Sequence, residues 1–292
     1  MSEILRKPLK MKQVLFTLIL ILAKVTTMSA SIEIIQVYSD SMKKDVPCVV
    51  ITPTNYDVQD STKRYPSVYM LHGYSGDHLG FRNFIPDIQA LVDFYQLIVI
   101  CPDGGYNSWY VDSPTSRKVK YETFTAKELV TYVDKNYKTI NDLKYRAIMG
   151  LSMGGHGALY LSIRHPETYG AACSMSGGVD FRPFPTEWEL KDRFGSLLFH
   201  RKDWDKYVVT EMVDSIPKNL HFMFDCGLDD FFFPVNRTFH EKLLKAGVKH
   251  DYIERPGGHD WTYWSNAMRY HLLFIHEFFD KNKGIKKVNL NE

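Results

Sequence analysis

The sequence predicts an α/β fold in which helices cover both faces of a mostly parallel, eight-stranded sheet. Short apolar runs rich in β-branched and aromatic residues alternate with longer segments of helical periodicity, a pattern typical of parallel strands joined by crossover helices. The chain has 292 residues, of which 45% are hydrophobic and 24% are charged, as in a globular protein. We find no internal repeat, low-complexity tract or linker, so residues 32–292 are expected to form a single domain.

Each expected element follows from its local pattern. We expect strands at Ile32–Tyr38, Val46–Thr52, Ser67–His72, Leu97–Cys101, Arg146–Met149, Ala171–Ser176, His221–Cys226 and His250–Glu254. The first two strands leave no room for a helix between them and should pair antiparallel. Helices are expected near Phe81–Tyr95, Glu122–Asn136, Met153–Ile163, Val235–Ala246 and Asn266–Phe279, where apolar residues recur at spacings of three and four.

The first 31 residues differ from the rest and match a secretory signal peptide. Basic residues from Arg6 to Lys12 precede the apolar run Val14–Ala23, and small residues follow around Ala30. That run is shorter than the roughly 20 residues a helix needs to cross a bilayer core, so stable membrane insertion is not expected. An uncleaved N-terminal anchor is the alternative. The mature protein is therefore expected to be secreted or periplasmic.

Charge and cysteine content narrow the possible partners. A formal net charge of +2 lacks the basic excess that binding to a nucleic-acid backbone requires. Cys48, Cys101, Cys173 and Cys226 all fall in apolar, strand-like runs, so buried free thiols are expected. The cysteine spacing matches neither a metal site nor a redox motif. No metal or organic cofactor is implied. The oligomeric state is left open.

Residues 179–219 interrupt the alternation of strands and helices. About forty residues with seven scattered aromatic side chains pass between two expected strands, and a structureless loop of that length is improbable in a compact domain. We expect a partly helical, cap-like insertion near the carboxyl ends of the strands, where such folds bind ligands. Additional core packing is the alternative.

The strongest motif is a G-x-S-x-G sequence, Gly150–Gly154, which follows an expected strand and precedes an expected helix. This context is that of a nucleophile elbow, a turn so sharp that the residues flanking the serine must be small. The turn would present Ser152 to substrate at a helix N-terminus, where peptide dipoles favour negative charge. Ser152 is therefore the candidate nucleophile.

A serine hydroxyl needs a base to activate it, and elbow hydrolases carry the acid and then the histidine after the serine. His259 lies on a short glycine-containing loop after the last expected strand, so it is the candidate base. The acid should follow the strand His221–Cys226, where Asp229 and Asp230 both qualify by position. Residue chemistry alone does not choose between these two aspartates.

The negative charge that develops on an attacked ester carbonyl requires two fixed N–H donors. Met153, directly after the nucleophile, should supply one of them. The turn after the third expected strand should supply the other, because Gly73 permits close approach and Tyr74 has a backbone amide.

These motifs resemble an esterase family that includes esterase D, the S-formylglutathione hydrolases, the feruloyl and acetyl-xylan esterases of carbohydrate esterase family 1, and the mycolyltransferases. The resemblance spans nearly the whole chain after residue 31. It is carried by LHGYSG at 71–76, PDGGYNSWYVDS at 102–113, GLSMGGHGAL at 150–159, CGLDD at 226–230 and PGGHDWTYW at 256–264.

The resemblance implies an α/β-hydrolase fold and a catalytic triad of Ser152, Asp230 and His259, because the family's acid stands third after the glycine. It also implies that Tyr74 and Met153 are the oxyanion-hole amides. Trp109 and Tyr110 resemble a stretch whose aromatic residues contact substrate in polysaccharide-directed esterases, with core packing as the alternative, and Trp261 is a further expected substrate contact. The expected partner is a small-molecule or oligosaccharide ester.

We expect a serine carboxylesterase acting through an acyl-enzyme on feruloyl or acetyl groups of plant cell-wall polysaccharide. A short-chain acyl esterase, an S-formylglutathione hydrolase-like thioesterase, an acyltransferase and a non-catalytic binding protein are the alternatives.

Overall fold

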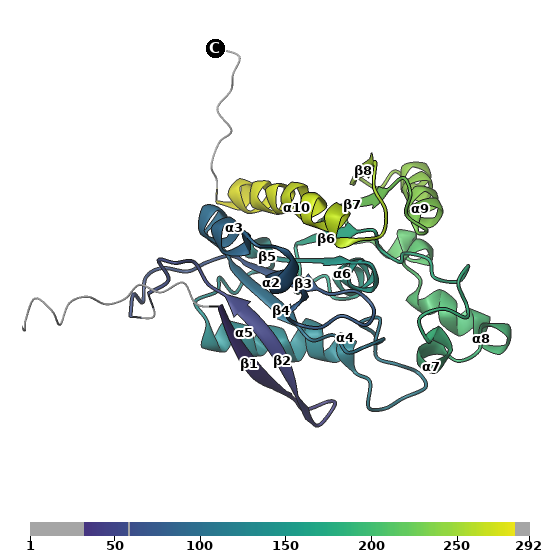
Figure 1. Ribbon diagram of the computed structural model, residues 1–292, viewed down its shortest axis with the longest axis horizontal. Helices are drawn as coiled ribbons and strands as arrows, with labels where there is room; N and C mark the ends of the chain where they lie inside the picture. Colours follow the sequence, from purple (N-terminus) through teal and green to yellow (C-terminus); the bar gives the residue numbers. More distant parts are fainter. Residues whose placement is uncertain (1–31, 58, 284–292) are drawn as a thin grey trace, which may run out of the picture.

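A computed structural model describes residues 32–57 and 59–283, which contain a single eight-stranded sheet (Figure 1). The segment predicted to be a signal peptide, 1–31, lies outside the described residues. The strands are β1 Ile32–Ser39, β2 Lys44–Ile51, β3 Ser67–Leu71, β4 Ile98–Pro102, β5 Arg146–Leu151, β6 Ala171–Met175, β7 His221–Gly227 and β8 Asp251–Arg255. All eight predicted strands are confirmed within two residues at each end.

The sheet is mostly parallel and has the order β1-β2-β4-β3-β5-β6-β7-β8. As predicted, β1 pairs antiparallel with β2, and β2 also runs antiparallel to β4. Every other pairing, from β4–β3 across to β7–β8, is parallel. The carboxyl ends of β3, β5, β7 and β8 therefore meet at one edge of the sheet, where ligand sites of such folds form.

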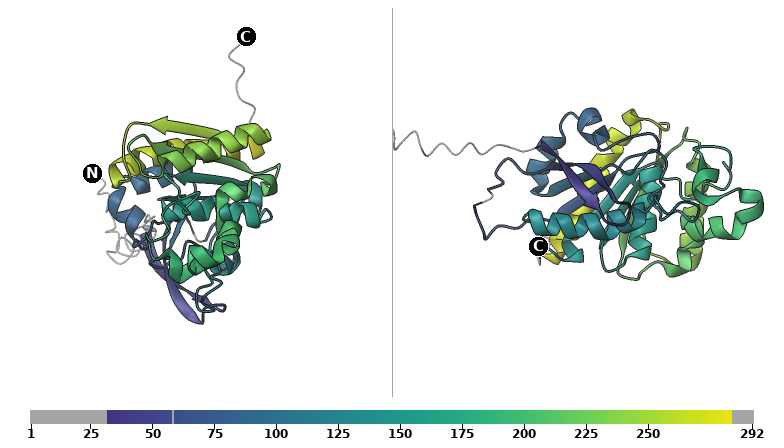
Figure 2. Two further views of the ribbon diagram at one scale, coloured as in Figure 1. Left: turned by 90° about the vertical axis from the view of Figure 1, so that its right-hand side faces the viewer. Right: turned by 90° about the horizontal axis from the view of Figure 1, so that it is seen from below.

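Successive side chains along each strand point to opposite faces of the sheet and pack into two separate hydrophobic cores. On β2, Val49 and Ile51 face the core that contains α3 and α10, whereas Cys48 and Val50 face the core that contains α5, α6 and α9. These helices are α3 Ile88–Tyr95, α5 Leu129–Asn136, α6 Met153–Arg164, α9 Phe233–Ala246 and α10 Trp261–Asn282. Figure 2 shows the two groups of helices on opposite sides of the sheet, which confirms the predicted helices on both faces. All four cysteines are buried and free, which confirms the predicted buried thiols.

Three predicted helices differ from those observed, and one of them, expected at Asn266–Phe279, is the longer α10 Trp261–Asn282. The expected helix Phe81–Tyr95 is wrong, because it is split into α2 Gly80–Phe84 and α3. Pro86 lies between the two helices and forces Ile85 out of the helical region, to φ −118° and ψ 87°. The helix expected at Glu122–Asn136 contains a π-helical segment, because α4 Tyr121–Thr123 runs through η1 Phe124–Glu128 into α5.

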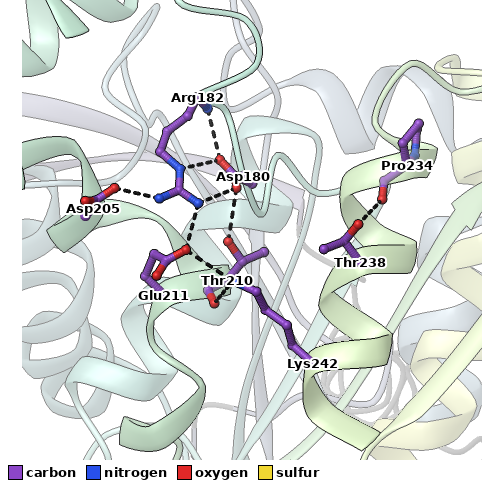
Figure 3. Close-up of polar contacts among 8 residues, drawn as sticks. All are labelled: Asp180, Arg182, Asp205, Thr210, Glu211, Pro234, Thr238 and Lys242. Atoms are coloured by element: carbon purple, nitrogen blue, oxygen red, sulfur yellow. Dashed lines mark hydrogen bonds and ion pairs between the residues drawn. The ribbon is translucent and has the colours of Figure 1, made fainter. Parts of the chain in front are cut away.

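Residues 179–219 form short helices beside the sheet rather than a structureless loop (Figure 1). These are α7 Leu190–Phe194, α8 Leu197–Trp204 and the 3₁₀ turns η3 Asp205–Tyr207, η4 Val209–Glu211 and η5 Val213–Ser215. Arg182 lies near the start of the segment and bonds to Asp180, Asp205 and Glu211 (Figure 3). The role of this segment as a cap stays a prediction.

Within residues 32–57 and 59–283, no helix has both the length and the apolar character needed to cross a membrane.

Candidate active site

Ser152 lies at a sharp turn between β5 and α6. Its backbone has φ 55° and ψ −118°, a combination that a residue with a side chain rarely adopts. The elbow glycines are required by close backbone contacts. A Cβ atom at Gly154 would lie 2.0 Å from the Leu71 carbonyl oxygen, and one at Gly150 would lie 2.3 Å from the Gly154 carbonyl oxygen. The sequence therefore folds here with the first turn of α6 pressed against the end of β3.

Three side chains that are distant in the sequence meet at the carboxyl edge of the sheet. His259 Nε2 lies 2.9 Å from Ser152 Oγ, and His259 Nδ1 lies 2.8 Å from Asp230 Oδ2. Ser152 comes from the end of β5, Asp230 from the turn after β7, and His259 from the loop between β8 and α10. The carboxylate can hold the Nδ1–H tautomer of the ring and leave Nε2 to accept the serine proton.

The two candidate acids occupy opposite environments. The Asp230 side chain is fully buried, and its Oδ1 accepts a hydrogen bond from the Phe232 N–H at 2.8 Å. Asp229 is exposed, and its backbone N–H donates to the Gly257 carbonyl at 3.0 Å. The geometry therefore brings Asp230, and not Asp229, to His259. The Asp229 backbone instead ties the turn after β7 to the loop that carries His259.

The two amides predicted to form the oxyanion hole belong to the residue after Ser152 and to the turn after β3. A Cβ atom at Gly73 would lie 3.3 Å from Ser152 Cβ, so the turn after β3 runs against the nucleophile. Tyr74 follows this glycine, and Met153 is the first residue of α6. Neither amide donates to another group in the described part of the chain, so both N–H groups are available to a ligand.

A cavity of about 480 Å³ opens at Ser152 and His259. Six aromatic side chains line it, namely Tyr74, Phe84, Trp188, Phe231, Trp261 and Trp264. Trp261 stacks on Phe84 with ring centroids 4.6 Å apart, and Trp188 stacks on Phe231 at 5.6 Å. Asp77 is the one acidic residue of the lining, and no lysine or arginine is among its described residues. The lining therefore suits a substrate that is uncharged and has an apolar group.

The prediction that Trp109 and Tyr110 contact substrate is wrong. Both side chains are at most 1% exposed and neither lines the cavity. Both residues have left-handed backbones, with φ 54° and 55°, which turn their rings into the core. The Trp109 ring packs on Phe181, and the Tyr110 hydroxyl donates to the His72 carbonyl at 3.1 Å. Trp261 does line the cavity, as a substrate contact would.

Sequence reasoning missed most of the aromatic lining. Trp188 was expected only as part of the segment 179–219, and Phe231 directly follows the candidate acid. The run of three phenylalanines after Asp230 was a usable signal, because apolar residues beside a buried acid must pack somewhere near it. The Phe231 ring lies 4.2 Å from the ring of His259.

Comparisons with known proteins identify the family of the chain. The family model described as "Putative esterase" matches residues 39–275. The chain belongs to this esterase family. A solved structure titled a ferulic acid esterase superposes with a TM-score of 0.74 and is 27% identical, with 86% of this chain and all of that chain covered. The strand order and helical layers described above are thus those of the α/β-hydrolase fold.

Two relatives of this chain are named as esterases. An esterase of Mycobacterium tuberculosis is 30% identical in an alignment of 238 residues, and the match covers 72% of this chain and 51% of the relative. This chain therefore spans about half of the length of that relative. An acetyl esterase of Caldicellulosiruptor saccharolyticus is 26% identical in an alignment of 252 residues, and the match covers 79% of this chain and 92% of the relative.

Proposed function

We propose that this family member is a serine carboxylesterase that works through an acyl-enzyme. The observation that carries the proposal is the continuous hydrogen-bonded chain from Ser152 through His259 to Asp230, with distances of 2.9 and 2.8 Å. A nucleophile, a base within hydrogen-bond reach and a group that orients the base are the parts that nucleophilic catalysis on an ester requires.

In the proposed mechanism, His259 Nε2 takes the Ser152 proton as the serine oxygen attacks the ester carbonyl. The Tyr74 and Met153 amides donate to the resulting oxyanion, and the buried carboxylate of Asp230 stabilises the imidazolium through Nδ1–H. The imidazolium then protonates the departing alcohol. Water, deprotonated by His259, attacks the acyl-enzyme by the same steps and releases the acid.

We propose that the substrate carries a feruloyl or acetyl group on plant cell-wall polysaccharide. A feruloyl group is a flat, uncharged aromatic acyl group, and the six aromatic side chains of the cavity offer it stacking surfaces. Relatives titled ferulic acid esterase and acetyl esterase support this choice. Export of the protein, proposed from the basic and apolar pattern of residues 1–31, would bring it to polymers outside the cell.

The charge of the lining favours a neutral ester over a glutathione thioester. Glutathione carries two carboxylates, which cationic side chains would bind, whereas the described lining contains no lysine or arginine and one acidic residue, Asp77. An anionic substrate is therefore expected to bind less well than a neutral one of similar size.

The test is a substrate panel run on the wild type and on Ser152→Ala. Feruloylated and acetylated xylo-oligosaccharides, S-formylglutathione and p-nitrophenyl acetate are compared by kcat/KM. We expect hydrolysis of p-nitrophenyl acetate and at least one of the xylo-oligosaccharides, and a loss of roughly three or more orders of magnitude in Ser152→Ala.

Ser265→Ala is the matched control, because Ser265 lies on α10 and, within the part of the chain that the structure describes, its hydroxyl bonds to the Thr262 carbonyl alone, at 3.1 Å. It should keep wild-type activity. Hydrolysis of simple esters alone would end the polysaccharide proposal, and an inactive wild type that also fails to react with a fluorophosphonate would end the esterase proposal. Transfer of the acyl group to added sugar, seen in the products, would indicate an acyltransferase.

A further inference from the structure

His72, directly before the turn that carries Tyr74, is buried and makes two short hydrogen bonds through its ring. Its Nε2 accepts from the Gly104 N–H at 2.7 Å, so the proton of the neutral ring is on Nδ1. Nδ1 lies 2.7 Å from the Gly73 carbonyl oxygen, to which it donates. Burial lowers the pKa of His72, although the Gly73 carbonyl and Asp103 oppose the shift. The ring is thereby kept in the neutral form that can make both bonds.

The Gly73 carbonyl and the Tyr74 N–H belong to one peptide group. Because a peptide group is planar, any contact that fixes the direction of its carbonyl also fixes the direction of its N–H. The His72 ring holds this carbonyl from one side, and the Gly76 N–H donates to the same oxygen at 3.1 Å. The direction of the Tyr74 N–H is therefore fixed by the two groups that donate to the Gly73 carbonyl, His72 Nδ1 and the Gly76 N–H.

Tyr110 holds the preceding peptide group. Its hydroxyl donates to the His72 carbonyl at 3.1 Å, and its ring is fully buried between two glycines. A Cβ atom at Gly104 would lie 2.3 Å from the Tyr110 ring, and one at Gly157 would lie 2.6 Å from it. The left-handed backbone of Tyr110 directs its ring into this space. The turn after β3 is thus held from β4 and α6 as well as by its own residues.

We propose that His72 and Tyr110 are positioning residues that aim the Tyr74 N–H at the oxyanion. The inference rests on the proposed function, because an oxyanion forms only if Ser152 attacks a carbonyl. Neither side chain needs to touch the substrate. Both act through the two consecutive peptide groups between His72 and Tyr74.

Two variants of His72 separate its two hydrogen bonds. In His72→Asn the side-chain amide nitrogen can take the place of Nδ1 and still donate to the Gly73 carbonyl. In His72→Gln the longer side chain can still accept from the Gly104 N–H, but the donor to Gly73 is lost. We expect kcat for p-nitrophenyl acetate to be about tenfold lower in His72→Gln than in His72→Asn, with KM values within twofold. That factor lies below the 10²–10³ lost when an oxyanion donor is removed outright.

Tyr110→Phe removes one hydroxyl and keeps the ring. We expect kcat to fall about fivefold, KM to stay within twofold, and the affinity for a trifluoromethyl ketone, which forms a tetrahedral adduct with the serine, to weaken by the same factor as kcat/KM. Tyr169→Phe is the matched control, because it also removes a buried hydroxyl that donates to a backbone carbonyl, that of Thr125 at 2.9 Å. It should lower the melting temperature as Tyr110→Phe does and leave kcat unchanged.

Equal kcat values for His72→Asn and His72→Gln, or a Tyr110→Phe variant that keeps both kcat and inhibitor affinity, would overturn the proposal. A fall in activity seen only as a higher KM would also overturn it. If His72→Gln does not fold, Tyr110→Phe and its control decide alone. The proposed function fails separately, because it requires an active wild type and an inactive Ser152→Ala.

Discussion

At the scale of single residues, the strained backbone of Ser152 is held by backbone hydrogen bonds to Met175, the last residue of β6, and to Gly178 just after it. The Ser152 N–H donates to the Met175 carbonyl at 2.9 Å, and the Ser152 carbonyl accepts from the Gly178 N–H at 3.2 Å. Strain of this kind persists only where the surrounding structure fixes it, and here it directs the hydroxyl toward His259. The nucleophile is therefore placed before any substrate arrives.

The adjacent aspartates after β7 should respond in opposite ways to the same substitution. Asp230→Asn would present an amide to His259 Nδ1 and favour the wrong ring tautomer, so we expect kcat/KM to fall by roughly 10⁴. Asp229 is exposed and holds its loop through its backbone N–H, which an asparagine retains, so Asp229→Asn should stay within about twofold of the wild type. Steady-state kinetics on p-nitrophenyl acetate compare the two variants. A larger loss in Asp229→Asn would refute the assignment of the acid.

At the scale of elements, the first turn of α6 and the end of β3 are in backbone contact. A Cβ atom at Gly154 would lie 2.0 Å from the Leu71 carbonyl oxygen and 2.6 Å from that of His72. We expect Gly154→Ala to destabilise the protein by about 3 kcal/mol or more, as overpacking at rigid backbone does. Because the contact also sets the distance between the elbow and the oxyanion turn, kcat/KM should fall by about 10² or more.

Gly247→Ala is the comparison for this prediction. Gly247 ends α9 with φ 69°, and apart from its chain neighbours no atom of the described residues lies within 4 Å of the Cβ position there. The substitution should therefore lower the free energy of unfolding by about 1–2 kcal/mol through backbone strain alone, with activity unchanged. Chemical denaturation measures both variants. A Gly154→Ala protein as stable and as active as the Gly247→Ala protein would contradict the packing argument.

The local sequence pattern was sufficient to predict those elements whose formation depends on a single strong requirement, such as burial or a fixed backbone turn. The eight strands are buried runs with clear ends, and the elbow motif has a fixed backbone requirement, so sequence located both. The proline at position 86 indicates the break between α2 and α3, but the predicted helix Phe81–Tyr95 ran through it. The start of α10 was also placed too late, although Asp260 caps it by accepting from the Tyr263 N–H at 2.9 Å.

The sequence does not decide whether Trp109 and Tyr110 contact substrate or pack in the core. Aromatic residues after a strand serve equally well as substrate contacts or as core, and only the fold decides which. Here the decision depends on left-handed backbones and on space beside Gly104 and Gly157, which come from different parts of the chain. The convergence of Ser152, His259 and an aspartate after β7 was easier to predict, because chain order and strand ends place them at one edge of the sheet, whereas the choice of Asp230 over Asp229 came from the family resemblance.

At the scale of the whole molecule, the segment 179–219 is joined to the sheet domain by an ion-pair cluster (Figure 3). Arg182 bonds to Asp205 at 2.6 Å and to Glu211 at 2.7 Å. Lys242 of α9 reaches Glu211 at 3.1 Å and also donates to the Thr210 carbonyl at 3.1 Å. The cluster thus connects the start of the segment, at Asp180 and Arg182, and its later part, at Thr210 and Glu211, with α9.

Removing Arg182 should weaken this connection in a pH-dependent way. Arg182→Gln leaves three carboxylates close together, and we expect a loss of about 1–3 kcal/mol at pH 7, between the values for exposed and buried pairs because these side chains are partly exposed. The hydrogen bond from Arg182 lowers the pKa of Glu211, so its contribution is present above the unfolded pKa of roughly 4.3 and is lost as pH falls through the lower folded value. The difference between variant and wild type should therefore shrink below about pH 4.

Urea denaturation at pH 7 and at pH 3.5 measures this difference. Lys206→Gln is the matched control, because Lys206 pairs with Asp203 at 2.8 Å on the surface, with 67% and 43% of the two side chains exposed. Exposed pairs of this kind contribute about 0–1 kcal/mol, so the control should change little at either pH. A loss in Arg182→Gln that stays constant between the two pH values would mean that packing of its aliphatic stem, and not its charge, joins the segment to the domain.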